Sequence, residues 1–188
     1  MKKKKKPATK KPATKKLARS LEVDPNPNSH RKIGKVAKAT EQKIDEMLGG
    51  RFSVPQAVIY SVKETKGGGL QVVKRHQGDD IYDLLGDSYT ADIARTSTYI
   101  AVLTCGWASP VEPGDDDSDE FIPPSEHPNR RRVRLVITAS RHKGVASVLR
   151  FADKPNEIML DEDKARGSLA DAIHDLFSCP PLTTFVTA

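Results

Sequence analysis

Four arginines in the second half of the chain have a spacing that suits anion binding. They are Arg130, Arg131, Arg132 and Arg134. Alternate residues of a strand share one face, so Arg132 and Arg134 would point the same way, and Arg150 on a partner strand could join them. A row of planar guanidinium groups suits a phosphate or a carboxylate. The alternative is a solvated strand face, balanced by Asp153, Glu157 or a nearby acidic loop.

That acidic loop precedes the arginines and has part of the spacing of a calcium-binding loop. Asp115, Asp117 and Asp119 fall at the first, third and fifth positions of such a loop, and Glu126 falls where a bidentate carboxylate belongs. Glu120, however, replaces the glycine that makes the sharp turn, and nearby prolines disfavour flanking helices. We therefore interpret the loop as a solvated connection between two strands, with calcium binding as the alternative.

No other pattern points to catalysis or to a cofactor. Cys105 and Cys179 fit no zinc spacing, and the five histidines are scattered. Gly67–Gly69 lacks the Lys-Ser/Thr that a phosphate-binding loop requires, so it predicts a turn between two strands. The sequence contains no serine elbow and no His-x-x-x-His pair. We expect no cofactor and favour a non-catalytic protein.

Positive charge is concentrated in residues 1–16, which we call the lysine arm. The arm holds nine of the 31 basic residues and no acid, so the other 22 basic residues face all 25 acidic residues. Repeated Pro-Ala-Thr-Lys-Lys units without aromatic side chains leave nothing to bury, which predicts disorder. Lysines on a flexible chain attract phosphates without fixed geometry. We expect non-specific nucleic-acid binding through Lys2, Lys3, Lys4, Lys5, Lys6, Lys10, Lys11, Lys15 and Lys16.

The lysine arm resembles the lysine-rich tails of linker histones and of some bacterial nucleoid proteins. This resemblance is compositional and implies association with DNA or RNA. A solubilising appendage, a nuclear localisation signal and a segment bound to anionic lipid are the alternatives.

Residues 33–178 predict one α+β domain, which follows a tail and linker (residues 1–32) and precedes a C-terminal extension (residues 179–188). The predicted helices are 33–48, a segment from 81 to 93 that could break at Gly86, and 168–177. The predicted strands are 56–64, 70–75, 99–107, 132–139 and 145–151. Five strands with mostly short connections imply a five-stranded antiparallel sheet with flanking helices. Residues 99–107 are apolar on both faces, which predicts a central strand with Cys105 as a small buried side chain.

The element order, α-β-β-α-β-β-β-α, resembles the profilin-like class that includes roadblock and longin domains. That resemblance implies a homodimer formed by edge-to-edge pairing of sheets. Residues 98–178 also resemble a family of uncharacterised bacterial proteins, through Gly-Trp-Ala-Ser-Pro at 106–110, His127-Pro128, the arginine-rich strand at 130–135, Ser-Val-Leu-Arg-Phe at 147–151 and the segment 165–172. This second resemblance implies no activity.

Taken together, the sequence favours an accessory or regulatory protein that is held near nucleic acid by its lysine arm, while its domain binds a protein partner. The alternative is a small-ligand sensor or an enzyme that uses Arg132, Arg134, Arg150 and the acidic loop Asp115–Glu126. No apolar run is long enough for a membrane-spanning helix. We therefore expect a cytoplasmic protein, associated with the nucleoid if the source is bacterial.

Overall fold

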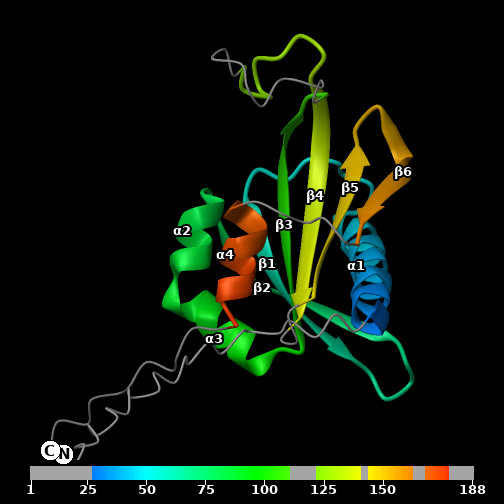
Figure 1. The fold of residues 1–188 in the computed structure, drawn as a ribbon, viewed down its shortest axis with the longest axis vertical. Helices are drawn as coiled ribbons and strands as arrows, with labels where there is room; N and C mark the ends of the chain where they lie inside the picture. The colour runs from blue at the N-terminus through cyan, green and yellow to red at the C-terminus, as the bar shows by residue number, and fades with distance from the viewer. Residues whose placement is uncertain (1–26, 111–121, 141–143, 163–167, 178–188) are drawn as a thin grey trace, which may run out of the picture.

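A computed structural model of the chain describes residues 27–110, 122–140, 144–162 and 168–177. These residues form an α+β fold around one antiparallel sheet of six strands, in the order β2-β1-β3-β4-β5-β6 (Figure 1). The strands are β1 (Ala57–Glu64), β2 (Leu70–Gly78), β3 (Tyr99–Ala108), β4 (Arg131–Ser140), β5 (Val145–Phe151) and β6 (Lys154–Asp161). The helices are α1 (Pro27–Leu48), α2 (Ile81–Gly86), α3 (Ser88–Thr96) and α4 (Ser168–Asp175).

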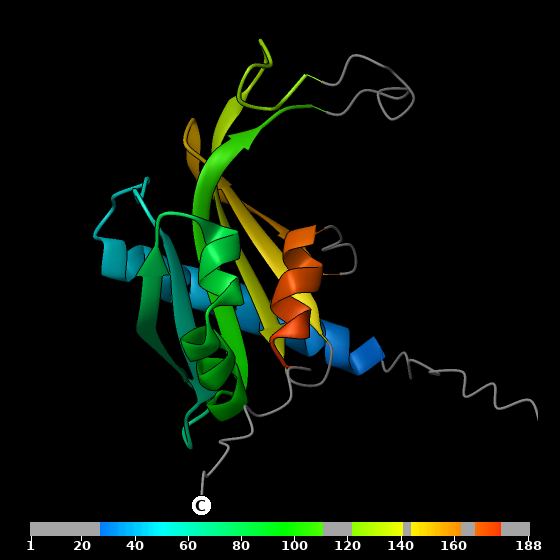
Figure 2. The ribbon, with the colours of Figure 1, turned by 90° about the vertical axis from the view of Figure 1, so that its left-hand side faces the viewer.

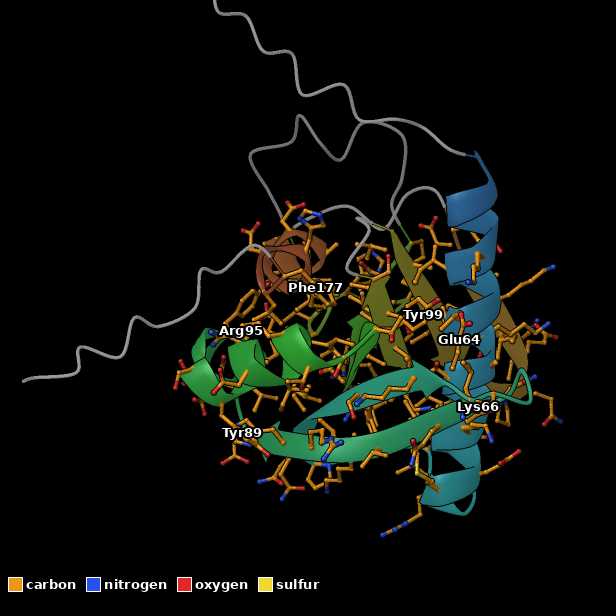
Figure 3. All side chains as sticks on the ribbon, turned by 90° about the horizontal axis from the view of Figure 1, so that it is seen from below. Glu64, Lys66, Tyr89, Arg95, Tyr99 and Phe177 are labelled. Carbon is orange, nitrogen blue, oxygen red and sulfur yellow. The ribbon has the colours of Figure 1, made fainter. Side chains whose placement is uncertain are left out.

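Helices cover both faces of the sheet. Helix α1 lies across one face and the three short helices lie against the other (Figure 2). Seen from below, α1 is on one side of the sheet, while α3 with Arg95 and the segment after α4 with Phe177 are on the other (Figure 3). Each face has its own apolar core, and both include residues of β3. The prediction of a central strand covered on both sides is therefore confirmed for residues 99–103, whereas residues 104–107 are less buried.

The prediction of five strands is wrong, because residues 154–161 form a sixth strand, β6, at the edge of the sheet. Lysine, proline, asparagine and glutamate at its start gave no strand pattern. An edge strand tolerates proline, since one of its sides needs no backbone partner, and Pro155 occupies such a position. Only Ile158 and Leu160 turn toward the α1 face, where they pack on the core.

Aspartate caps divide the segment after β2 into two helices, as Gly86 had suggested. Asp80 accepts hydrogen bonds from the backbone N–H groups of Tyr82 and Asp83, and α2 then ends at Gly86. Asp87 caps α3 by accepting from the N–H of Tyr89 at 2.9 Å. The side-chain oxygen of an N-cap satisfies backbone donors that the first helical turn leaves open.

Helix α1 begins at Pro27, earlier than the predicted start at Ile33. Proline is well tolerated in the first turn of a helix because its missing N–H would have no partner there. The residues from 27 to 32 thus belong to the helix and not to the linker. Among the described residues, no helix combines the length and the apolar character that a membrane crossing requires.

Candidate functional site

The outer ends of β3 and β4 form a two-stranded ribbon that extends beyond the rest of the sheet (Figures 1 and 2). Strand β1 pairs with β3 only as far as Leu103, and β5 pairs with β4 only from Val133 onward. The pairing of β3 with β4 continues to Trp107 opposite Arg132 and Ala108 opposite Arg131. The ribbon therefore carries a tryptophan and several of the predicted arginines outside the covered part of the sheet.

Trp107 and two arginines, Arg130 and Arg132, make up what we call the Trp107 platform. The indole of Trp107 is 40% exposed, which is high for the largest aromatic side chain. The guanidinium carbon of Arg130 lies 5.0 Å from the centre of its ring, and that of Arg132 lies 5.2 Å away. Both distances are within the range of cation–π attraction. Among the described residues, neither of these outer arginines forms an ion pair with a carboxylate.

Arg131 points to the opposite face of the ribbon and is neutralised there. Its guanidinium lies 3.8 Å from the centre of the Phe151 ring and binds both carboxylate oxygens of Asp153 at 2.8 Å. The hydrogen bonds from Arg131 hold the pKa of Asp153 below its ordinary value. The sequence suggested Asp153 as a carboxylate that balances the arginines, and in the structure Asp153 pairs with Arg131.

The two inner arginines, Arg134 and Arg150, lie beneath α1. They are opposite each other on β4 and β5, as alternation along the strands predicted. Arg134 is 1% exposed, and its Nη2 donates to Glu41 at 2.8 Å and also to Asp45. Arg150 donates from Nε and Nη2 to the two carboxylate oxygens of Glu41, at 2.8 and 2.7 Å.

Two carboxylates therefore balance the two inner arginines. The hydrogen bonds that Arg150 donates to Glu41 raise the pKa of Arg150 above its ordinary value. Glu41 is itself 1% exposed, so its negative charge depends on these partners. The arginines of the predicted anion site therefore fall into two groups with different surroundings. Arg134 and Arg150 hold α1 on the sheet, and Arg130 and Arg132 are left at the surface.

The segment after α1 brings two backbone carbonyl groups to this face. Gly49 and Gly50 have φ angles of 58° and 80°, which glycine adopts without strain, and they end the helix. The chain then passes Arg134, whose Nη1 donates to the carbonyl oxygen of Arg51 at 3.3 Å. The thiol of Cys105 lies 3.7 Å from the carbonyl oxygen of Phe52. Cys105 is only partly buried, not fully buried as predicted.

A groove lies on the opposite face of the sheet, between α2, α3 and α4. It has a volume of about 530 Å³ and is lined by apolar atoms of Leu85, Ala91 and Leu176, with Tyr82 and Arg95 beside them. The hydroxyl group of Tyr82 is 2.8 Å from that of Ser168, which joins α2 to the start of α4.

A histidine–carboxylate pair stands beside that groove. Nε2 of His76 lies 2.9 Å from Oδ2 of Asp87, and the His76 ring meets the edge of Tyr89. The backbone N–H of Tyr89, followed by the His76 hydrogen bond, holds the pKa of Asp87 below its ordinary value. The same carboxylate caps α3 and contacts His76 on β2, so these two structural contacts account for the position of the Asp87 side chain.

Several predicted site residues lie outside the described residues. These are the nine lysines of the arm and the three aspartates of the calcium alternative, Asp115, Asp117 and Asp119. Glu126 is described; it is exposed, and its N–H donates to the carbonyl oxygen of Pro123 in a turn. Within the described parts of the chain, no group of three or more His, Cys, Asp or Glu side chains could hold a metal ion.

Comparison of the chain with family models, with curated proteins and with solved structures gave no match.

Sequence reasoning missed two participants in this arrangement. Glu41 was not recognised as a partner of the arginines, although it follows Ala37 by four residues and precedes Ile44 by three, on the stripe of α1 that faces the sheet. Trp107 was expected to be part of a covered strand. Its exposure follows from the length of the ribbon, which depends on where β1 and β5 end.

Proposed function

We propose that this protein is a non-catalytic accessory or regulatory protein that binds nucleic acid at two places. The lysine arm supplies sequence-independent attraction to phosphates. The Trp107 platform then holds a single strand against the ribbon of β3 and β4. The observation that carries this proposal is the exposed ring of Trp107 within cation–π distance of two arginines that have no carboxylate partner among the described residues.

The chemistry of the platform suits an unpaired base with its neighbouring phosphates. Every base has a flat face that stacks on an aromatic ring, at about 1–3 kcal/mol per base. A guanidinium group binds phosphate oxygens in pairs and also rests on aromatic faces. Bases in a duplex are already stacked, so a side chain that offers stacking favours single-stranded DNA or RNA.

The predicted protein partner is a second part of the proposal. The apolar groove between α2, α3 and α4 supports a protein partner, because the removal of apolar surface from water by a bound partner is favourable. The homodimer implied by the roadblock resemblance would use β2 or β6, the two edges of the sheet. Pro155 and the charged ends of β6 discourage strand pairing there, so β2 is the edge that we favour.

The experiment is a binding titration at several salt concentrations, with a single-stranded oligonucleotide of about 15 nucleotides followed by fluorescence anisotropy. Four full-length proteins are compared. They are the unmodified chain, a variant with all nine arm lysines changed to glutamine, that variant with Arg130→Gln and Arg132→Gln added, and a control with Arg131→Gln added instead.

Neutralising the arm should reduce the log–log salt slope from about −5 to between −1 and −2, because only the platform arginines still contact phosphates. Adding Arg130→Gln and Arg132→Gln should lower the remaining affinity at least tenfold. Arg131→Gln should leave it nearly unchanged, since Arg131 is already paired with Asp153. Equal losses in the two arginine variants would show that the platform is not the site.

A further inference from the structure

A second pocket lies on the α1 face, and it is formed entirely by parts of the fold that the Trp107 platform does not use. It lies between the C-terminal end of α1, the segment after it, and strands β1 and β2, and its volume is about 350 Å³. That volume fits a small molecule and is too small for a folded partner. We call it the Tyr60 pocket, after the buried tyrosine in its wall.

The hydroxyl group of Tyr60 is an unused hydrogen-bonding group. Tyr60 is 4% exposed and lines the pocket, and no hydrogen bond joins its hydroxyl group to another described residue. The hydroxyl oxygen is not among the fully buried side-chain atoms that lack a partner, so it is accessible from the pocket and a ligand can reach it. Burial raises the pKa of Tyr60, so the hydroxyl keeps its proton at neutral pH and can donate it to a ligand.

Two cationic side chains line the same pocket. Lys74 is the cross-strand neighbour of Tyr60 on β2, so the two side chains share one face of the sheet. Arg51 reaches the pocket from the segment after α1, and its Nε donates to the carbonyl oxygen of Leu48 at 3.2 Å, which fixes the direction of the guanidinium. Both residues are exposed at the pocket mouth.

No carboxylate is among the residues that line this pocket, all of which belong to the described part of the chain. Asp79 is the carboxylate tied to its rim, and the amide of Gln56 binds it at 2.9 Å. The remaining polar lining is neutral, with Gln77 accepting a hydrogen bond from Lys74. The pocket therefore offers two positive charges and a hydroxyl donor to whatever enters it.

The rest of the lining is apolar. Leu48 and Val58 form part of it, so one portion of a ligand would be covered by hydrocarbon while another meets the charged groups. A phosphate monoester carries up to two negative charges, which matches the two cations, whereas a carboxylate carries one. We infer that the Tyr60 pocket binds a small phosphate monoester with an apolar or aromatic body, through Tyr60, Lys74 and Arg51. This inference does not depend on nucleic-acid binding by the Trp107 platform.

The test uses three probes and the full-length protein in isothermal titration calorimetry. Phenyl phosphate has both parts of the expected ligand, inorganic phosphate lacks the apolar part, and benzoate carries a single charge. Phenyl phosphate should bind at least tenfold more tightly than either of the others. Benzoate or inorganic phosphate binding as tightly as phenyl phosphate would overturn the assignment, and so would the absence of phenyl phosphate binding.

Two variants locate the ligand within the molecule. Tyr60→Phe removes only the unpartnered hydroxyl, so the fold should keep its melting temperature while affinity for phenyl phosphate falls about tenfold or more. Lys74→Gln should cause a similar loss. Lys63→Gln is the matched control, because Lys63 alternates with Val62 and points to the other face of β1. Unchanged affinity in Tyr60→Phe and Lys74→Gln, or an equal loss in Lys63→Gln, would contradict a site in this pocket.

Discussion

Arg134, an inner arginine, and the outer arginines Arg130 and Arg132 come from one stretch of sequence, yet their surroundings differ completely. Arg134 is 1% exposed and faces the buried carboxylate of Glu41, whereas Arg130 and Arg132 stand on an exposed tryptophan ring. The difference arises from how far α1 and β5 extend along β4. Where α1 covers the strand, an arginine needs a carboxylate; where the ribbon projects, an arginine is available for a ligand. The same residue type thus stabilises the fold in one place and forms a candidate site in the other.

The largest effect should come from removing one member of the buried ion pairs. Arg134→Met leaves Glu41 buried with fewer donors, which costs about 3–5 kcal/mol of unfolding free energy. Arg130→Met, the matched change on the platform, should alter stability by no more than about 0.5 kcal/mol. Urea denaturation followed by circular dichroism measures both. If the two variants lost similar stability, the distinction between inner and outer arginines would be wrong.

A smaller loss should follow when the inner charge is kept but its geometry is changed. Arg150→Lys retains the positive charge and cannot donate to both oxygens of Glu41 at once. We expect a loss of about 1.5–3 kcal/mol, the range for a hydrogen bond to a charged group. Arg132→Lys on the platform should leave the denaturation midpoint unchanged. A neutral result for Arg150→Lys would mean that charge alone holds α1 to the sheet.

These outcomes bear on how much of the arrangement could be predicted from sequence. Alternation along strands correctly placed Arg134 and Arg150 on a common face, since the period of a strand is two whatever the partner. It did not reveal what lies opposite that face. The sequence also did not identify Asp45 as a partner, because only the packing of α1 across β4 and β5 brings its carboxylate to the arginines.

The edges of the sheet were harder to predict than its centre. Strand β3 is apolar on both faces, so its sequence alone indicates burial, and the Gly67–Gly69 turn marks the hairpin of β1 and β2. Strand β6 buries little more than Ile158 and Leu160. With only two inward side chains and a proline near its start, its pattern cannot be distinguished from a loop until β5 is in place as a partner.

The smallest effect should be a pH dependence at Arg131, the arginine that is paired but exposed. Because the pKa of Asp153 is lowered in the folded state, its contribution to stability is complete above its ordinary pKa and is lost as the pH falls through the lower, folded value. The stability difference between the unmodified protein and Arg131→Gln should therefore shrink from about pH 4 downward. Asp153→Asn should abolish that change. A difference that grows in acid would contradict the pairing.

The most direct test of the central claim uses the fluorescence of Trp107, which is the single tryptophan of the chain. A single-stranded oligonucleotide is titrated into the full-length protein, and tryptophan emission and oligonucleotide anisotropy are recorded together. If a base stacks on the platform, emission should be quenched with the same midpoint as the rise in anisotropy. A full rise in anisotropy with unchanged tryptophan emission would show that the lysine arm binds alone and that the Trp107 platform is not a nucleic-acid site.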